Sequence, residues 1–243
     1  MGTMDNTYKV LRQQTLWEEL FFYQKAVVLY QLTYEFVQRF LHRGDRTIDQ
    51  MLQAARSGKQ NIVEGSADGV TSIEMELKLL NVARSSIKEL LEDYMDYLTS
   101  RQLTIWNKHH PRYDTMLKFC RQHNKWEDYC SYARKWSDEE IANIAVTLCH
   151  MIDKMMMSYQ SKIEKDFVEH GGIRERMTAA RLNYRHDRDE EIKKLKQRVA
   201  ELEKKLRDNH IEIYVGKTRN PRNPRNPRIS RTSRTSRTSR KKL

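Results

Sequence analysis

Residues 57–66, SGKQNIVEGS, contain the Gly-Lys pair found in phosphate-binding loops. Such a loop also needs a glycine five residues earlier and a Ser or Thr directly after the lysine, but Gln53 and Gln60 occupy those places. Apolar residues instead recur at the three, four and seven spacing of one helix face: Ile48, Met51, Leu52, Ala55, Ile62 and Val63. The sequence therefore predicts a helix here rather than a nucleotide-binding loop.

Basic and aromatic side chains are interleaved between residues 101 and 136. This segment holds eight Lys and Arg, including Lys118, Arg121 and Lys125, against three Asp and Glu. Basic groups attract phosphate, and aromatic faces stack on unpaired bases. The same composition is typical of a helical insertion whose tryptophans join the core while its lysines face water. Both interpretations stay open at this point.

Zinc ligands could come from the same segment, as Cys120 and His123 with Cys130 and either His109 or His110. Their spacing matches no established finger or ribbon. Buried cysteines more often serve as small apolar residues, so we predict no metal.

An acidic group, Glu92, Asp93 and Asp96, could suggest a metal-dependent nuclease. No His, Lys or second acidic motif accompanies it, and charge runs on helices are normally solvated. The sequence also lacks a nucleophile–base arrangement for hydrolysis. We therefore predict a protein without catalytic activity or cofactor.

The formal charge of +12 belongs almost wholly to the C-terminal tail. Residues 217–243 contain 11 Lys and Arg and no acidic residue, which leaves 34 basic against 33 acidic residues elsewhere. A three-residue repeat fills most of this tail, and it has too few apolar residues to fold, so we predict that 211–243 is disordered when free.

The repeat of the tail also has a possible ligand. Polyproline II geometry would align its first four arginines on one edge about 9 Å apart, a spacing that could track a phosphate backbone. A slipped DNA repeat without function is an equally good interpretation. On the first interpretation, the nucleic-acid-binding residues are Arg219, Arg222, Arg225, Arg228, Arg231, Arg234, Arg237 and Arg240.

Helix-breaking residues are almost absent between about residues 16 and 210, which predicts an all-α body. Its periodicity predicts four long amphipathic helices joined by short connectors, and an antiparallel up-down four-helix bundle is the simplest way to bury their apolar faces. Residues 1–15 would form an N-terminal arm, 16–171 the bundle, and 101–136 a shorter helical insertion within it.

Capping patterns mark where these helices begin and end. Asp45 or Thr47 can cap the second helix. The sequences TSIE at 71–74 and SDEE at 137–140 both fit the capping box that begins a helix. Gly171 and Gly172 provide a C-terminal stop for the fourth helix.

The sequence predicts one long charged helix with a short coiled coil over residues 172–210. Its apolar seam alternates spacings of three and four over about three heptads. In a parallel pair Glu191 would face Lys196 of a second copy, and Arg198 would face Glu203. Packing of a single helix on its own bundle is the alternative. The seam consists of Ile192, Leu195, Val199, Leu202 and Leu206.

No run of 18 apolar residues and no secretory signal pattern is present. The three cysteines are odd in number and lack a framework spacing. We therefore predict a cytoplasmic protein without membrane contact or disulfide.

The stretch QMLQAARSGKQNIVEG, Gln50 to Gly65, resembles the signature of the bacterial four-helix-bundle proteins encoded in 23S rRNA intervening sequences. That signature reads Gln, two variable residues, Arg-Ala-Ala, a variable residue, Ser, and then Asn-Ile-Ala-Glu-Gly. A second segment, LLNVARSSIKELLE, resembles the family's Ala-Arg-Gly-Ser and Glu-Leu pattern. The matching residues are Gln50, Ala54, Ala55, Ser57, Asn61, Ile62, Glu64, Gly65, Leu80, Ala83, Arg84, Ser86, Glu89 and Leu90.

The resemblance covers most of residues 16–186, and accessory variability determinant proteins of diversity-generating retroelements share the same fold. It implies an up-down bundle without catalytic activity, commonly assembled as a pentamer. It also implies that the partners are nucleic acid, RNA more than DNA, and a reverse transcriptase. A structural scaffold for protein–protein contacts, with a nonspecific basic tail, is the alternative function.

Within this signature, Ala54, Ala55, Ser57 and Gly58 are small and would let neighbouring helices approach closely. Arg84 interrupts an apolar stripe and needs a carboxylate partner if it is buried. We predict that Glu64, at the end of the neighbouring helix, is this partner.

Overall fold

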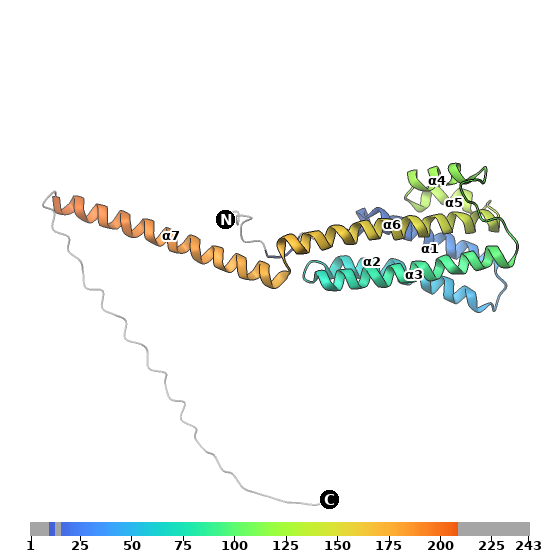
Figure 1. Cartoon of the computed structure of the whole chain (residues 1–243), viewed down its shortest axis with the longest axis horizontal. Helices are drawn as coiled ribbons and strands as arrows, with labels where there is room; N and C mark the ends of the chain where they lie inside the picture. Colours follow the sequence, from blue (N-terminus) through green and yellow to red (C-terminus); the bar gives the residue numbers. More distant parts are fainter. Residues whose placement is uncertain (1–9, 13–15, 209–243) are drawn as a thin grey trace, which may run out of the picture. The chain divides into compact units, whose positions relative to one another are not determined.

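The structure is a computed structural model that describes residues 10–12 and 16–208. These residues form helices and no strand, which confirms the predicted all-α class. The predicted tail 211–243, with all its arginines, and most of the predicted arm 1–15 lie outside the described residues. The elements are η2 (Trp17–Glu19), α1 (Phe21–Phe40), α2 (Arg46–Asp68), α3 (Ile73–Ser100), α4 (Tyr113–Gln122), α5 (Trp126–Ala133), α6 (Asp138–His170) and α7 (Ile173–Asp208), as Figure 1 shows.

The chain divides into two compact units, Met1–Asp189 and Glu190–Leu243. The first contains α1 to α6 and the beginning of α7, and the second contains the rest of α7.

Residues 57–66 lie inside α2, so the predicted helix is confirmed at the Gly-Lys pair.

Two of the predicted helix starts are confirmed. The Asp45 side chain accepts a hydrogen bond from the backbone N of Thr47 at 2.9 Å. At α6, the Ser137 hydroxyl accepts from the backbone N of Glu140, and the Glu140 carboxylate accepts from the backbone N of Ser137. These reciprocal bonds satisfy two backbone donors that a helix start leaves open.

The predicted capping box at 71–74 is wrong by one residue. Ser72 caps α3, because its hydroxyl accepts from the backbone N of Met75 at 3.2 Å. The Thr71 hydroxyl instead donates to the backbone O of Asp68 and so closes the end of α2. Because α3 begins at Ile73, the capping position falls on Ser72 rather than on Thr71.

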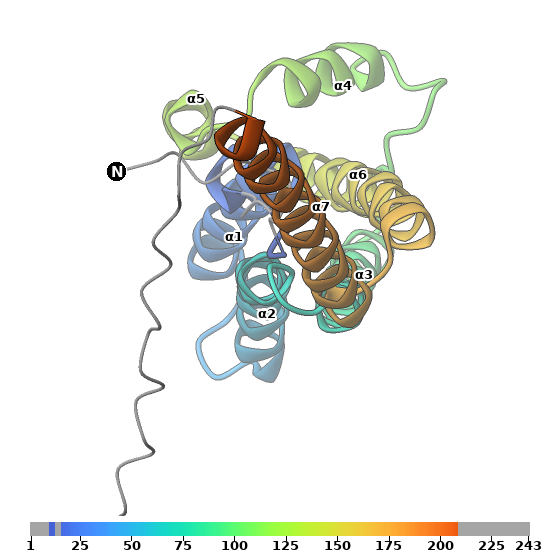
Figure 2. The same ribbon diagram turned by 90° about the vertical axis from the view of Figure 1, so that its left-hand side faces the viewer.

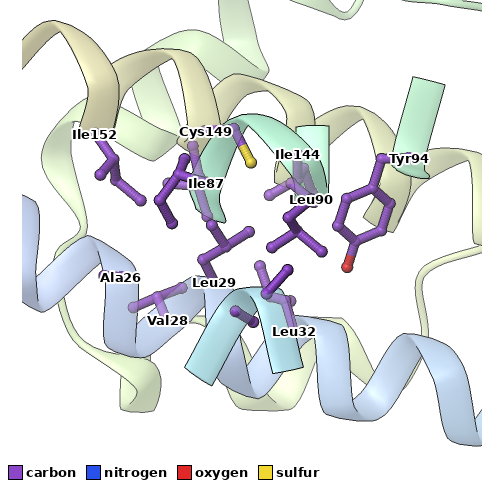
Figure 3. Close-up of a cluster of buried hydrophobic side chains, with 14 of the residues drawn as sticks. Ala26, Val28, Leu29, Leu32, Ile87, Leu90, Tyr94, Ile144, Cys149 and Ile152 are labelled. Atoms are coloured by element: carbon purple, nitrogen blue, oxygen red, sulfur yellow. The ribbon is translucent and has the colours of Figure 1, made fainter. Parts of the chain in front are cut away.

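Four long helices enclose the apolar core of the first unit. Contacts join α1 to α2, α2 to α3, α3 to α6 and α6 to α1, as the end-on view of Figure 2 shows. Their inward faces meet in a cluster of buried Leu, Ile and Val side chains (Figure 3). We name α1, α2, α3 and α6 the core helices.

Tyr94 and Tyr129 are the largest fully buried side chains of this cluster, and Tyr94 lies on α3. Its ring packs edge-on against Phe36 with 5.0 Å between ring centroids, and its hydroxyl donates to the Thr33 hydroxyl at 3.0 Å. Thr33 in turn donates to the backbone O of Leu29. Tyr94 therefore joins α1 and α3 through both an aromatic contact and a polar one.

Small residues bring α2 and α3 close together, as predicted. A Cβ added at Gly58 would lie 2.7 Å from Cδ1 of Ile87, closer than real Cβ contacts allow. Nearby, the Ser86 hydroxyl donates to the Ser57 hydroxyl at 3.0 Å, and the Asn61 amide donates to the backbone O of Ser57 at 2.9 Å. Gly58 and Ser57 thus pack α2 against α3, whereas the bond of Asn61 lies within α2.

The predicted pair between Glu64 and Arg84 is wrong. Arg84 Nε donates to Asp153 Oδ1 at 2.7 Å, and Arg84 Nη1 donates to Gln160 Oε1 at 3.1 Å. Glu64 is exposed to solvent. The reason is helix geometry. Gly58 of α2 lies against Ala83 of α3. Arg84 is the next residue along α3, and one residue step along a helix turns the side chain by about 100°. Arg84 therefore points to α6 and fixes α3 against α6.

Residues 10–12, the described part of the predicted arm, are anchored to the core helices. Arg12 Nη1 lies 2.8 Å from Glu76 Oε2, and the Glu76 carboxylate also accepts from the Tyr159 hydroxyl at 3.0 Å. Burial raises the pKa of Glu76, and the nearby Arg12 charge opposes that rise. The ion pair thus offsets part of the cost of burying this carboxylate.

Candidate nucleic-acid interface

Residues 101–136, which we name the hairpin, carry α4 and α5 on the outside of α1 and α6. α5 contacts α1 and α4 contacts α6, as Figure 2 shows. The segment before α4 is tied to α6 by Asn143, whose side chain accepts from the backbone N of Trp106 at 2.7 Å and donates to the backbone O of Thr104 at 2.9 Å. Glu139 accepts from the Trp106 indole at 2.9 Å.

Two basic side chains of α1 hold the C-terminal ends of α4 and α5. The Lys25 ammonium donates to the backbone O of Cys120 and, at 3.2 Å, to the backbone O of His123. Arg39 donates to the backbone O of Ala133 at 2.6 Å and of Trp136 at 2.9 Å. The last carbonyls of a helix lack partners and carry partial negative charge, so a cation satisfies both needs.

Lys25 is only 3% exposed, and burial lowers the pKa of its ammonium. Burial also raises the pKa of the neighbouring Cys120 thiol to about 11. That thiol is therefore protonated at neutral pH and is a poor nucleophile or metal ligand. The buried pair acts in packing, with Lys25 as the anchor of the hairpin.

We expect Lys25→Met to lower the free energy of unfolding by about 1–3 kcal/mol, because the buried Cys120 carbonyl loses its ammonium donor, whereas the His123 carbonyl still accepts from the Tyr129 hydroxyl. Hydrogen exchange should become faster in residues 113–136, while exchange in α3 stays unchanged. Lys118→Met, at an exposed position of α4, is the control and should change stability by no more than about 0.5 kcal/mol. Unchanged exchange in the hairpin of Lys25→Met would contradict this anchoring role.

An aromatic pocket of about 460 Å³ lies where α4, α5 and α6 meet. The Tyr132 and Trp136 rings stack in its wall, with 5.9 Å between centroids and 17° between planes. Phe119 contacts Trp136 edge-on at 6.0 Å. Tyr132 is 53% exposed, so the pocket reaches solvent. Its lining residues are Trp106, Pro111, Arg112, Thr115, Met116, Phe119, Tyr132, Trp136, Glu140 and Ile144.

The volume falls in the range of small-molecule sites, and apolar lining with a few polar groups is typical of such sites. The charged groups here are Arg112 and Glu140, whose side chains form an ion pair at 2.7 Å. Flat aromatic walls favour a planar aromatic guest, because offset or edge-on ring contacts are favourable. A nucleic-acid base meets this description.

The hairpin around the pocket presents positive charge to solvent. All eight of its Lys and Arg side chains are exposed, against three acidic residues, Asp114, Glu127 and Asp128. The basic residues are Arg101, Lys108, Arg112, Lys118, Arg121, Lys125, Arg134 and Lys135. Phosphate attraction and aromatic surface are thus present in one substructure.

The two interpretations of this segment were a nucleic-acid surface and a helical insertion whose tryptophans join the core. Each of them describes part of the hairpin. Trp106 is buried, and Trp126 and Trp136 are partly buried against the core. Trp136 nevertheless also lines the pocket. Within residues 10–12 and 16–208, no group of three or more His, Cys, Asp or Glu side chains could hold a metal ion.

None of the other predicted site residues belongs to the hairpin sequence. Gln50, Ala54, Ala55, Ser57, Asn61, Glu64 and Gly65 belong to α2, and Arg84 and Glu89 belong to α3. The seam residues Ile192 to Leu206 belong to α7. The eight tail arginines fall outside the described residues.

Sequence reasoning missed several pocket residues, notably Phe119, Tyr132 and Glu140. One signal was available: Arg112, Thr115, Met116 and Phe119 follow the spacing of a single helix face. The contribution of Glu140 could not be read in this way, since it reaches the pocket from α6, beyond the second hairpin helix.

These features define an all-helical protein with an aromatic, positively charged surface site. Comparisons with family models, with curated proteins and with solved structures found no match. The resemblance of residues 50–65 to the intervening-sequence proteins therefore stays a prediction. No helix in the described part of the chain has both the length and the apolar character needed to cross a membrane.

Proposed function

We propose that this chain is a non-enzymatic helical-bundle protein that binds single-stranded nucleic acid, with RNA preferred to DNA. The observation that supports this most is the aromatic pocket within a hairpin whose eight basic side chains are all exposed. In this proposal an unpaired base stacks on Tyr132 and Trp136, while the hairpin cations attract the phosphates.

The described contacts also supply the rigidity that such a site needs. Lys25 and Arg39 fix the ends of both hairpin helices, and Asn143 fixes the segment that leads into them. A pocket held in place before binding loses little conformational entropy when it takes up a base. The tail arginines, from Arg219 to Arg240, would add phosphate contacts without base selectivity.

The preference for RNA and an accessory role beside a reverse transcriptase rest on the sequence resemblance alone. The antiparallel up-down order proposed for the core helices rests on their apolar periodicity and on the resemblance, whereas a pentamer is implied by the resemblance alone. In this proposal the protein works in the cytoplasm, uses no cofactor and makes no membrane contact.

A salt titration of RNA binding tests the proposal. Labelled single-stranded and duplex RNA would be bound to the full chain and to a chain that ends at Gly216. We expect the shorter chain to retain binding to single-stranded RNA, with a smaller salt slope because fewer counterions are released. Complete loss of binding on truncation would contradict a site on the hairpin.

A protein–protein scaffold is the second candidate function, and the exposed apolar seam of α7 favours it. The two functions differ in one measurable respect, because counterion release makes nucleic-acid binding fall steeply with salt while apolar association does not. A chain that binds no RNA at low salt, yet still associates, would support the scaffold.

A further inference from the structure

The second unit of the chain carries an uncovered apolar seam. Ile192, Leu195, Val199 and Leu202 of α7 are 41%, 58%, 53% and 45% exposed, and Leu206 continues the series at the next position. The described part of α7 has no buried residue. Single exposed apolar residues are ordinary, but a series on one helix face marks an interaction surface.

We propose that this seam pairs with the seam of a second copy of the chain in a parallel two-stranded coiled coil. Ile192 and Val199 occupy the first core position of the heptad, and Leu195 and Leu202 occupy the second. β-Branched residues at the first position with Leu at the second favour two parallel strands over larger assemblies.

Charge complementarity indicates that the partner of the seam is a second copy of the chain. Glu191 and Arg198 directly precede core residues, and Lys196 and Glu203 directly follow them. In a parallel pair these flanking positions meet across the seam, so Glu191 faces Lys196 and Arg198 faces Glu203, twice each by symmetry. All four side chains are exposed in the single chain. Both of these pairs between two copies therefore join opposite charges.

Sedimentation equilibrium of the full chain, without RNA and over a range of concentrations, tests the pairing. We expect the mass to rise from the 29.2 kDa of one chain to twice that value. Leu195→Glu with Leu202→Glu should keep the protein at the mass of one chain, because charges in the seam cannot be desolvated. A mass of five chains, or association that survives this variant, would overturn the proposal.

Gln197→Glu with Ala200→Glu is the matched control, since it adds the same two charges on the outer face of the helix. This control should still form pairs, and circular dichroism should show equal helix content in both double variants. Loss of pairing in the control as well would overturn the assignment of the seam.

Charge reversal tests the parallel orientation. Glu191→Lys alone should weaken pairing on the order of tenfold, since it replaces two attractions by two repulsions. Adding Lys196→Glu should restore pairing to within about threefold of the original chain. Failure of the second change to restore it would overturn the parallel arrangement. The inference does not rest on the proposed RNA binding, and RNA titrations of the paired and unpaired variants would separate the two.

Discussion

Reversing three exposed charges of the hairpin should reduce RNA affinity about 100-fold or more at low salt. The change is Lys118→Glu, Arg121→Glu and Lys125→Glu in the chain that ends at Gly216, so that the tail arginines cannot compensate. Each lost phosphate contact means that fewer counterions are released on binding, and each new carboxylate repels phosphate. The slope of log affinity against log salt concentration should therefore fall in magnitude by about three, roughly one for each lost contact. Fluorescence anisotropy with single-stranded RNA measures both quantities.

The matched control reverses three exposed lysines on the core helices, Lys78, Lys88 and Lys165, and alters net charge equally. If attraction is a property of the hairpin, this control should lose less than about tenfold, because more distant charges are screened. Equal losses in the two triple variants would show that only net charge matters, and would contradict a localised interface.

Replacing Tyr94 by Ala should lower the free energy of unfolding by about 3–5 kcal/mol, the usual range for an aromatic residue removed from a core. Tyr94 is fully buried, so its loss leaves a cavity beside Phe36. The Thr33 hydroxyl also loses the hydrogen bond that it accepts from Tyr94. Tyr94→Phe removes only the hydroxyl contact and should cost about 1 kcal/mol. Urea denaturation measures both changes.

Tyr34 offers a control for Tyr94 on the same pair of helices, since it lies on α1 and is 50% exposed. Its replacement by Ala should change stability by about 0.5 kcal/mol or less. Similar losses at Tyr94 and Tyr34 would mean that the packing of α1 against α3 is not as described.

Local patterns predicted the helices well, because the period of apolar residues is a property of each segment. The stretch at residues 57–66, for example, was predicted to be helical and lies inside α2. Errors occurred where contacts with neighbouring segments decide at which residue a helix begins. The bundle was expected to begin at residue 16, but Leu20 has an extended backbone with ψ of 116°, and α1 begins after it.

Contacts between distant segments were the least predictable part of the molecule. Arg84 pairs with Asp153, 69 residues away, and no spacing rule within a helix indicates such a partner. The pocket is similar, because α4, α5 and α6 each contribute only part of its lining. The charge and aromatic content of residues 101–136 identified the region, whereas its shape depended on packing that Lys25 and Arg39 provide from α1.

The most direct test of the proposed site is photocrosslinking of the full chain to single-stranded RNA that carries 4-thiouridine, with the adducts mapped by mass spectrometry. We predict adducts on the aromatic lining of the pocket, above all on Phe119, Tyr132 and Trp136, and lower yields with duplex RNA because its bases are not free to stack. Adducts confined to residues 209–243, or equal yields from duplex and single-stranded RNA, would contradict a base-binding pocket on the hairpin.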